Sequence, residues 1–327
     1  MTNAICLNEK YSTTRLAIKE KPIIESKLED KFETILFLPE GKNRKAEGGL
    51  RTKGYFKKSY EDKPLITVIT VVYNEFQDIE ETIQSVINQT CSNIEYIIID
   101  GGSTDGTLDI IKKYENQIDY FVSEEDDGIY EAMNNGLFLA TGIWIAFMNG
   151  GDSYYSNDAV KDLMEAGLSN SDVVYGQTNY IYSNEYSKIV HTSTFEEKKF
   201  SMPFCHQSCM VKTKLHKQNP FNTEYKIGAD YCFFFYLHSI KSRFVMTNKV
   251  IANFKLDGLS SIITRLHRKE RKDILLKHNT TFKFRVELFI WEQNRLFKYI
   301  VKKLPFSLYL VKIKYYIIGK MMKRKEH

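Results

Sequence analysis

The chain has 327 residues, 43% of them hydrophobic and 27% charged, a composition typical of a globular protein with one large core, or one core and a smaller appendage. Its five cysteines are odd in number and irregularly spaced, so we expect no disulfide framework and a reducing compartment. The N-terminal residues lack the pattern of a signal peptide, and no apolar run of about 18 residues predicts a membrane-spanning helix.

The net charge of +5 conceals an asymmetry along the chain. Residues 265–327 contain 18 Lys and Arg against 5 Asp and Glu, a net charge of +13. The remainder contains 28 Lys and Arg against 36 Asp and Glu, a net charge of −8. A basic segment of this kind favours binding to nucleic acid or to an anionic membrane surface.

Residues 1–63 are polar and weakly periodic, and we expect a loop-rich extension that packs on a larger domain. The periodic part begins at Pro64. Ile66–Tyr73 is β-branched and apolar on both faces, which is typical of a central parallel strand. The next segment has a helical pattern, and Asp78 and Glu81 resemble a capping box at its start.

Strands and helices continue to alternate after this helix, which predicts an α/β fold with a doubly wound, mostly parallel sheet. The expected strands are Ile94–Ile99, Tyr120–Val122 and Trp144–Met148, and the expected helices are Leu108–Tyr114 and Ile129–Leu139. Asp172–Tyr182 and Ser242–Leu256 predict further strands in a mixed second half, and the chain beyond Arg265 has a basic, aromatic, helical pattern.

Polar residues follow the four expected parallel strands: Asn74 and Glu75, then Asp100, then Glu124–Asp127, then Asp152. Ligands of open parallel sheets bind beyond the carboxyl ends of the strands. A single aspartate there is usually a turn residue, but acidic or amide groups at four consecutive strand ends favour a ligand site.

A crevice with this many carboxylates would repel an anion unless a divalent cation lay between them, and oxygen ligands favour Mg²⁺ or Mn²⁺. The segment DGGSTDGT lacks the G-x-G-x-x-G spacing, which argues against an NAD site. Cys205, His206 and Cys209 have no second ligand pair at zinc spacing, so we interpret the cysteines as structural.

Six motifs occur in an order that resembles family 2 glycosyltransferases with the GT-A fold: TVVYNE, IIIDGGSTDGT, SEEDDGIYEAMNNG, ATGIWIAFMNGGD, CHQS and GADYCFFF. The resemblance is strongest to the bacterial branch that builds capsule, colanic-acid and O-antigen repeat units. It covers residues 64–261, leaving 1–63 as the extension and 262–327 as a basic helical C-terminal region.

The resemblance implies roles for individual residues. Tyr73 and Glu75 match the strand end that lines the nucleotide pocket, Asp100 matches the aspartate that recognises the base, and Asp126 matches the acidic residue after the third strand. An ionised carboxylate such as that of Asp100 accepts hydrogen bonds, and uracil and guanine offer ring N–H donors.

Asp152 matches the last carboxylate of the DxD-type metal motif. Asn149 and Gly151 stand where a full motif has further acidic residues, so we expect one carboxylate and the substrate diphosphate to hold the cation. Asp230 matches the family's catalytic base, although an aspartate at a helix start is otherwise usually a cap. His206 and Gln207 match a pair found near the diphosphate or the acceptor, and we place Asn149 with them.

These residues predict an inverting glycosyltransferase of the hexosyltransferase type, in which Asp230 takes a proton from the acceptor hydroxyl and the cation stabilises the departing diphosphate. Its expected partners are a nucleotide-diphosphate sugar and a lipid-linked saccharide acceptor used in surface polysaccharide synthesis. The sequence leaves UDP, GDP and dTDP donors open. No carboxylate pair indicates a glycosidase, and YNEFQD lacks the Gly-rich loop of a nucleotidyltransferase. A catalytically silent relative that binds a nucleotide sugar or a partner is the alternative.

From Leu296 the chain interleaves lysines with apolar and aromatic residues. This pattern favours a segment in the interface of an anionic membrane, placing the protein on the cytoplasmic face. A helix that packs on the catalytic domain is the second interpretation, and nucleic-acid binding ranks third because no recognition module is apparent.

Overall fold

The computed structural model describes residues 4–23, 34–167, 170–183, 185–198, 200–256, 265–278 and 285–294. The chain divides into two compact units, Met1–Arg271 and Lys272–His327, and the sheet and the candidate site belong to the first. Among the described residues, no helix is long and apolar enough to cross a membrane. The basic segment from Leu296 lies outside the described residues, as do residues 257–264.

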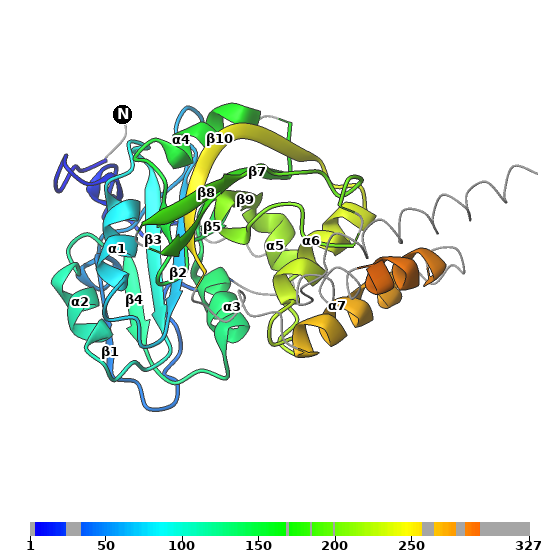
Figure 1. Ribbon diagram of the computed structural model, residues 1–327. Coiled ribbons are helices and arrows are strands. Elements are labelled where there is room, and N and C mark those ends of the chain that lie inside the picture. Colours follow the sequence, from blue (N-terminus) through cyan, green and yellow to red (C-terminus); the bar gives the residue numbers. More distant parts are fainter. Residues whose placement is uncertain are drawn as a thin grey trace, which may run out of the picture. The chain divides into compact units, whose positions relative to one another are not determined.

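The first unit is built on one mixed sheet in the order β1-β4-β3-β2-β5-β9-β7-β10-β6, with β8 paired to β7 (Figure 1). Its first half contains four parallel strands: β2 (Ile66–Val72), β3 (Ile94–Asp100), β4 (Tyr120–Ser123) and β5 (Trp144–Phe147). Every residue of these strands is buried, because helices cover both faces of the sheet. The predicted α/β fold class is therefore confirmed.

The second half of the sheet is mixed. Its strands are β6 (Ser153–Tyr154), β7 (Val173–Ser183), β8 (Tyr186–Val190), β9 (Cys209–Lys212) and β10 (Phe244–Lys255). Strand β9 runs antiparallel to both β5 and β7, so it joins the two halves. Strand β10 is parallel to β7 and pairs with β6 at its end, and β7 and β8 form an antiparallel pair at the edge.

Helices cover the two faces of the sheet. Helices α1 (Ile79–Ile87), α2 (Thr107–Lys113) and α4 (Ala159–Gly167) share one hydrophobic core with the even-numbered apolar residues of β2. Helix α3 (Ile129–Leu139) lies on the other face, with α5 (Thr213–Gln218) beside it. The approach of α3 is close, since a Cβ on Gly136 would lie 2.6 Å from Cγ2 of Ile69.

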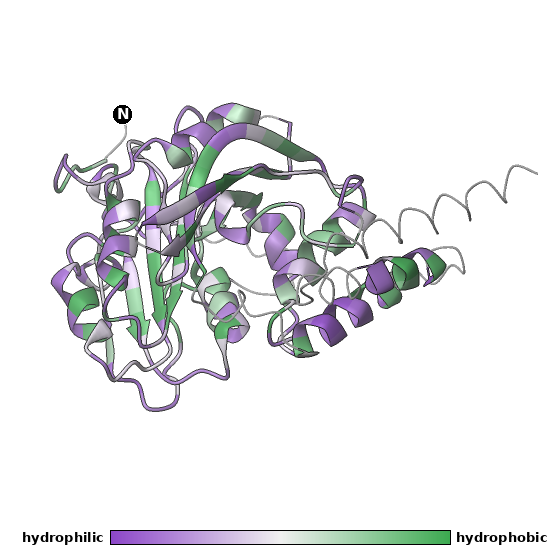
Figure 2. Cartoon of the chain, viewed as in Figure 1, coloured by the Kyte–Doolittle hydropathy of each residue, from purple (hydrophilic) through white to green (hydrophobic). Residues whose placement is uncertain are grey.

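Two further helices follow. Helix α6 (Ala229–Ser239) carries the GADYCFFF motif, and α7 (Arg265–His278) begins the basic region; residues 285–294 are also helical. Short 3₁₀-helices occur at Ser12–Thr14, Arg51–Lys53 and His206–Ser208. In Figure 2 the central strands are predominantly hydrophobic, while α1 and α2 alternate between hydrophobic and hydrophilic residues, as expected for amphipathic helices on a sheet.

The residues before Pro64 extend the sheet. Strand β1 (Ala46–Gly48) pairs antiparallel with β4, and Ile18 forms a bridge with Phe56. Arg51 is 2% exposed, and its guanidinium lies 2.6 Å from the carboxylate of Glu95 on β3. It also donates to the carbonyl oxygens of Leu36 and Leu139, so one side chain ties three segments together.

We expect Arg51→Met to lower the free energy of unfolding by about 3–5 kcal/mol, because it leaves the buried carboxylate of Glu95 without its cation. Lys53→Met is the matched control, since Lys53 forms an exposed pair with Glu115 that contributes at most about 1 kcal/mol. Urea unfolding followed by circular dichroism measures both. Equal midpoints for the two variants would contradict a structural role for the buried pair.

Candidate active site at the carboxyl ends of the parallel strands

The order of the parallel strands creates a crevice at one edge of the sheet. The chain passes from β2 to β3 and β4 on one side and then returns to β5 on the other side of β2. Ligands of open α/β sheets bind where the strand order reverses in this way. The segments that flank this point are Tyr73–Glu75, after β2, and Asn149–Asp152, after β5.

The loops after β2 and β3 hold each other in place. The backbone N–H of Asn74 donates to Oγ of Ser103 at 2.8 Å, and the N–H of Thr104 donates to Oδ1 of Asn74 at 2.8 Å. The N–H of Glu75 donates to Oγ1 of Thr107 at 2.9 Å. Four loop residues are thus fixed before any ligand binds, and the Tyr73–Glu75 segment is presented at the crevice in one conformation.

Tyr73 and Asp126 meet across Gly101. A Cβ on Gly101 would lie 2.8 Å from Oδ2 of Asp126 and 3.4 Å from Cδ2 of Tyr73, so a larger residue would close the space between them. Tyr73 is 63% exposed, and its ring is open to a ligand. Burial raises the pKa of Asp126, and the neighbouring carboxylates of Glu131 and Asp100 raise it further.

Asp100 lies behind this opening and is fully buried. Its Oδ1 accepts from the hydroxyl of Ser103, its Oδ2 accepts from the hydroxyl of Ser123, and the N–H of Ser103 lies 3.2–3.3 Å from both oxygens. In this conformation the carboxylate braces the loop after β3. To accept a hydrogen bond from a nucleotide base, Asp100 would have to lose its hydrogen bond to Ser103 or Ser123. Recognition of the base by Asp100 therefore stays a prediction.

The two glycines before Asp152 form a tight turn. The N–H of Asp152 donates to the carbonyl oxygen of Asn149 at 3.1 Å, and Gly151 has φ +92°, a conformation that favours glycine. A Cβ on Gly150 would lie 2.7 Å from Cγ2 of Val72. The turn therefore packs against the end of β2. A Cβ on Gly151 would lie 3.7–4.0 Å from the carboxylate of Glu75, so the turn also lies beside that side chain.

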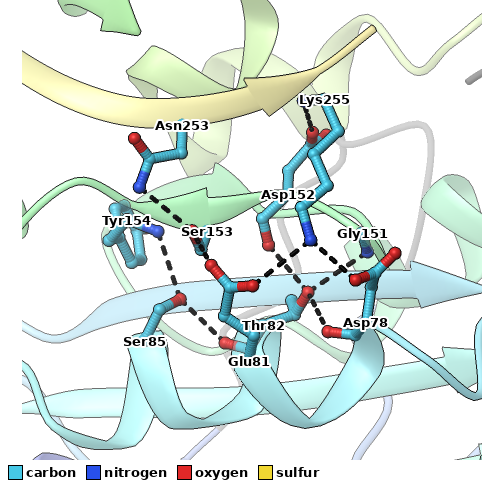
Figure 3. A network of polar contacts seen from close by, with 10 residues as sticks. All are labelled: Asp78, Glu81, Thr82, Ser85, Gly151, Asp152, Ser153, Tyr154, Asn253 and Lys255. Atoms are coloured by element: carbon cyan, nitrogen blue, oxygen red, sulfur yellow. Dashed lines mark hydrogen bonds and ion pairs between the residues drawn. The ribbon is translucent and has the colours of Figure 1, made fainter. Parts of the chain in front are cut away.

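Three elements distant in sequence hold the Asp152 turn, and Figure 3 shows the contacts that Thr82 and Lys255 make. Thr82 of α1 donates to the carbonyl oxygen of Asp152 at 2.7 Å and accepts from the N–H of Gly151 at 3.2 Å. The side-chain amide of Gln207 donates to Oδ2 of Asp152 at 2.9 Å, and the backbone N–H of Lys255 donates to Oδ1 at 3.1 Å. Asp152 is 7% exposed, and these two donors set the direction of its carboxylate.

The expected capping box of α1 is wrong. Neither Asp78 nor Glu81 caps the helix; the ammonium group of Lys255 lies 2.7 Å from Asp78 and 3.2 Å from Glu81 (Figure 3). Burial lowers the pKa of Lys255, but the two carboxylates outweigh it, and the net shift is upward. No sequence pattern predicts these contacts of Lys255, because its partners are more than 170 residues away along the chain.

Asn149 contributes a second oxygen to the turn. Its Oδ1 is buried and has no hydrogen-bond partner among the described residues. No group of three or more His, Cys, Asp or Glu in the described part of the chain could hold a metal ion by itself. One carboxylate and one amide oxygen nevertheless suit Mg²⁺ or Mn²⁺, which usually bind one or two protein oxygens together with substrate phosphates.

His206 lies in an aromatic cluster. Its ring is 5.1 Å from that of Phe147 and 5.6 Å from those of Phe221 and Phe234. Burial lowers the pKa of His206 to about 4, so the ring is neutral near pH 7. Gln207, its neighbour, is the member of the pair that reaches Asp152.

Asp230 opens α6. Its Oδ1 accepts from the N–H of Tyr231 at 2.7 Å and from the hydroxyl of Tyr130 at 3.1 Å, which also donates to the carbonyl oxygen of Ile227 at 2.6 Å. Both of these hydrogen bonds fall on Oδ1. Burial raises the pKa of Asp230 above its ordinary value, although Tyr231, Tyr130 and Arg271 act to lower it.

Glu270 fixes the loop before Asp230. Its buried carboxylate accepts three backbone N–H groups, those of Lys226, Ile227 and Gly228, at 2.8–3.0 Å. No sequence motif singles out Glu270, because it lies in a segment whose dominant feature is its positive charge.

The segment Cys205–Gln207 contacts both the Asp152 turn and helix α6. The Sγ of Cys205 lies 2.9 Å from Oε1 of Gln207, the residue that contacts Asp152. The ring of His206 lies 5.6 Å from that of Phe234 on α6, the helix that Asp230 opens. Burial raises the pKa of the Cys205 thiol, and the carboxylates of Asp152 and Asp230 raise it further.

Residues 67–237, just over half of the chain, match the family model described as glycosyl transferase family 2. The chain belongs to this family. A PGL/p-HBAD biosynthesis glycosyltransferase of Mycobacterium bovis (strain BCG / Pasteur 1173P2) is 29% identical over 181 residues, which are 52% of this chain and 68% of the relative. The putative teichuronic acid biosynthesis glycosyltransferase TuaG of Bacillus subtilis (strain 168) is 39% identical over 104 residues, 31% of this chain and 41% of TuaG.

The fold of this glycosyltransferase is similar to that of S. aureus TarS 1-349, solved in complex with UDP-GlcNAc. The TM-score is 0.53 at 19% sequence identity, over 65% of this chain and 65% of that chain. The matches to TarS and TuaG thus span less than two thirds of those proteins. The predicted family, transferase class and GT-A fold are confirmed.

The turn that carries Asp152 depends on the Thr82 hydroxyl. We expect Thr82→Val to lower the free energy of unfolding by about 1–3 kcal/mol, because it leaves the carbonyl oxygen of Asp152 without its donor. Thr82→Ser keeps the hydroxyl and should retain most of the stability. Thr90→Val, which removes an exposed hydrogen bond to Asp158, is the control in urea unfolding. If Thr82→Val lowers the free energy of unfolding by no more than Thr90→Val does, the Thr82 hydroxyl does not hold the turn.

Proposed function

We propose that this enzyme is an inverting, metal-dependent glycosyltransferase that transfers a sugar from a nucleotide-diphosphate sugar to a saccharide acceptor. The proposal rests on one observation above all: the segment Cys205–Gln207 contacts the Asp152 turn at the strand-end crevice and also packs on α6, the helix that Asp230 opens. A donor bound at the crevice would then present its reacting carbon towards a carboxylate.

The donor nucleotide is proposed to lie along the ends of β2, β3 and β4. The exposed ring of Tyr73 offers a stacking surface, and Asp126 closes the opposite side of the space above Gly101. Glu75 lies beside the Asp152 turn. Asp100 is proposed to accept a hydrogen bond from the base.

Asp152 and Asn149 are proposed to hold Mn²⁺ or Mg²⁺ together with the diphosphate. The unpartnered Oδ1 of Asn149 supports this, since a buried amide oxygen without a donor is costly unless a ligand fills its place. When bound, the cation supplies Lewis-acid stabilisation of the charge on the leaving diphosphate. Gln207 and the N–H of Lys255 orient the Asp152 carboxylate for this purpose, and His206 packs behind Gln207 as a neutral ring.

Asp230 is proposed to be the general base. Its Oδ2 would take the proton of the acceptor hydroxyl as that oxygen attacks the sugar carbon, and a single displacement inverts the configuration there. The upward shift of its pKa makes the carboxylate a stronger base. The Tyr231 N–H and the Tyr130 hydroxyl fix the orientation of the carboxylate.

The relatives named for PGL/p-HBAD and teichuronic acid biosynthesis support a role in the synthesis of a bacterial surface glycan. We propose residues 64–261 as the catalytic domain, 1–63 as its extension, and 262–327 as a region that attaches the protein to the inner face of the plasma membrane. The charge of the last region supports membrane attachment, because each Lys or Arg near an anionic surface contributes about 1 kcal/mol. A lipid-linked acceptor would then lie within reach of the site.

The first test is binding of UDP, GDP and dTDP by calorimetry, each with Mn²⁺ and with EDTA. We expect one nucleotide to bind in the presence of Mn²⁺, and Asp152→Asn to weaken that binding by at least roughly 10–100-fold. Asp158→Asn, at an exposed position six residues along, should bind as the unmodified protein does. If nucleotide binding is the same with Mn²⁺ and with EDTA, and is unchanged in Asp152→Asn, then Asp152 has only a structural role in the turn.

The second test is the pH profile of kcat/KM. Activity should rise with pH through the pKa of Asp230, because only the ionised form accepts a proton, and the midpoint should lie above the ordinary aspartate value. Tyr130→Phe removes a hydrogen bond that favours the ionised form, so it should move the acid limb up by roughly half a unit to one unit.

Tyr114→Phe, which removes a hydrogen bond to the exposed Glu80, is the matched control and should leave the limb in place. Asp230→Asn should abolish transfer while it retains nucleotide binding. An acid limb that does not move in Tyr130→Phe, or full activity of Asp230→Asn, would exclude Asp230 as the base.

A further inference from the structure

The loop between α5 and α6, residues 219–228, leads into the helix that carries Asp230, and it contains no helix or strand of its own. Asn134 of α3 anchors the start of the loop. Its side-chain amide donates to the carbonyl oxygen of Phe221 at 2.9 Å and accepts from the N–H of Phe221 at 3.0 Å. The position of Asp230 depends on how the other end of the loop is held, because an unanchored end would let the start of α6 move.

Glu270 of α7 holds that other end. The residue is 6% exposed, and its Oε1 accepts from the N–H of Lys226 at 2.8 Å. Its Oε2 accepts from the N–H groups of Ile227 at 3.0 Å and Gly228 at 2.9 Å. An ionised carboxylate only accepts hydrogen bonds, so it matches three donors that point at one place. Helix α6 has no side-chain cap at Gly228, and this carboxylate from α7 fixes the start of the helix instead.

Ile227, the middle residue of the three, links Glu270 to Asp230. The hydroxyl oxygen of Tyr130 lies 2.6 Å from the carbonyl oxygen of Ile227 and 3.1 Å from Oδ1 of Asp230. A tyrosine hydroxyl has one hydrogen to donate, and O–H···O bonds are usually about 2.7–2.8 Å long. The Ile227 carbonyl therefore holds most of this hydrogen bond, and Asp230 receives the weaker share.

This sharing affects the strength of Asp230 as a base. A hydrogen bond to a carboxylate stabilises its charged form and so lowers its affinity for a proton. An ionised carboxylate is also a stronger acceptor than a neutral carbonyl oxygen. If the carbonyl group of Ile227 moved away, the Tyr130 hydroxyl would donate fully to Asp230 and make it a weaker base.

The other titratable groups around Asp230 keep their charge while it titrates. Burial raises the pKa of Asp230, and the guanidinium of Arg271 on α7 lowers it and stays charged. Burial raises the pKa of the Cys205 and Cys209 thiols, and the carboxylate of Asp230 raises both further, so both thiols stay protonated. Burial also raises the pKa of Tyr130, so its hydroxyl keeps its hydrogen.

We propose that Glu270 is a positioning residue for glycosyl transfer, which holds the carbonyl oxygen of Ile227 on the Tyr130 hydroxyl. Asp230 is thereby left as the stronger base, as removal of a proton from the acceptor requires. This inference rests on the proposed role of Asp230. Glu270 lies beyond residues 67–237, which match the family model, so the part of the chain that acts on the base extends into α7.

The test is a titration of Asp230 in the full chain, followed by NMR of protein labelled with ¹³C at the aspartate carboxyl carbons. Asp230→Asn assigns the signal, because that resonance disappears. We expect Glu270→Asp to lower the pKa of Asp230 by roughly half a unit to one unit, since the shorter side chain cannot hold all three N–H groups and the Tyr130 hydroxyl turns to Asp230. Glu270→Asp keeps the negative charge, so loss of charge cannot cause this shift. The acid limb of kcat/KM should move down by the same amount.

The same substitution in the Tyr130→Phe variant separates this route from others. Tyr130→Phe alone should raise the pKa of Asp230, and adding Glu270→Asp should change it no further, because no hydroxyl remains to be shared. Asp273→Asn is the matched control: its side chain lies on the same helix, is 47% exposed and pairs with Lys277, so the titration of Asp230 should be unchanged. Nucleotide affinity with Mn²⁺ should be the same in all these variants, since none of them alters the Asp152 turn.

Two outcomes would overturn the proposal: Glu270→Asp leaves the titration of Asp230 unchanged, or its shift persists in full when Tyr130→Phe is also present. Circular dichroism checks that each variant is folded. If Glu270→Asp does not fold, Glu270→Gln is titrated instead, and it should show the same downward shift and lose most of it in combination with Tyr130→Phe. A failure of the proposed function is distinct, because Asp230→Asn would then retain transfer activity whatever the titration shows.

Discussion

The site depends on how one buried carboxylate is held. Asp152 sits on a four-residue turn that has no regular structure of its own, and its position is fixed by Thr82 of α1, by Gln207 and by the backbone of Lys255. A buried carboxylate without hydrogen bonds costs several kcal/mol, so each donor is required. Because these donors come from positions 82, 207 and 255, the turn takes its geometry only when both halves of the sheet have formed.

Lys255 supplies the positive charge in the network around the Asp152 turn. Lys255 places its ammonium group on Asp78 and Glu81, while its backbone N–H holds Asp152. The ion pairs anchor the end of β10 to α1, and the anchored backbone then presents its N–H to the turn. The charge of the Lys255 side chain thus positions the backbone N–H that holds Asp152. It also neutralises the carboxylates of Asp78 and Glu81, so these two need no other cation.

Three aspartates illustrate how hydrogen bonding decides what a carboxylate is able to do. A carboxylate offers about four acceptor positions. Serine hydroxyls and a backbone N–H occupy those of Asp100, which makes it a brace. The amide of Gln207 and the N–H of Lys255 each hold one oxygen of Asp152, so they set the direction of that carboxylate. The Tyr130 hydroxyl and the Tyr231 N–H both donate to Oδ1 of Asp230, so its two oxygens differ in their surroundings.

The parallel half of the fold could be predicted from sequence, because its strands are buried on both faces and appear as continuous apolar runs such as Ile66–Val72. The expected boundaries differ from the observed ones by a residue or so. The residues at the strand ends could be predicted for the same reason, since their place follows from where the apolar run stops.

The remaining parts of the site depend on contacts that sequence patterns do not encode. Asp78 and Glu81 have the spacing of a capping box, yet a lysine from β10 outcompetes the helix N–H groups for them. Glu270 lies among basic residues, and only its three backbone partners reveal its structural role. Ser103 is the exception: it follows Asp100 by three residues, the spacing of a side-chain-to-backbone turn, and could have been found.

The two sides of the site are constrained differently. Donor-side residues such as Glu75 and Asp126 follow strands whose every residue is buried, so changing the backbone there disturbs the core. The β7–β8 pair ends in exposed residues, and all of β8 except Val190 is exposed. Substitutions on such an edge have little effect on packing. The β7–β8 edge can therefore change in sequence with little effect on the core, whereas the strand ends on the donor side cannot.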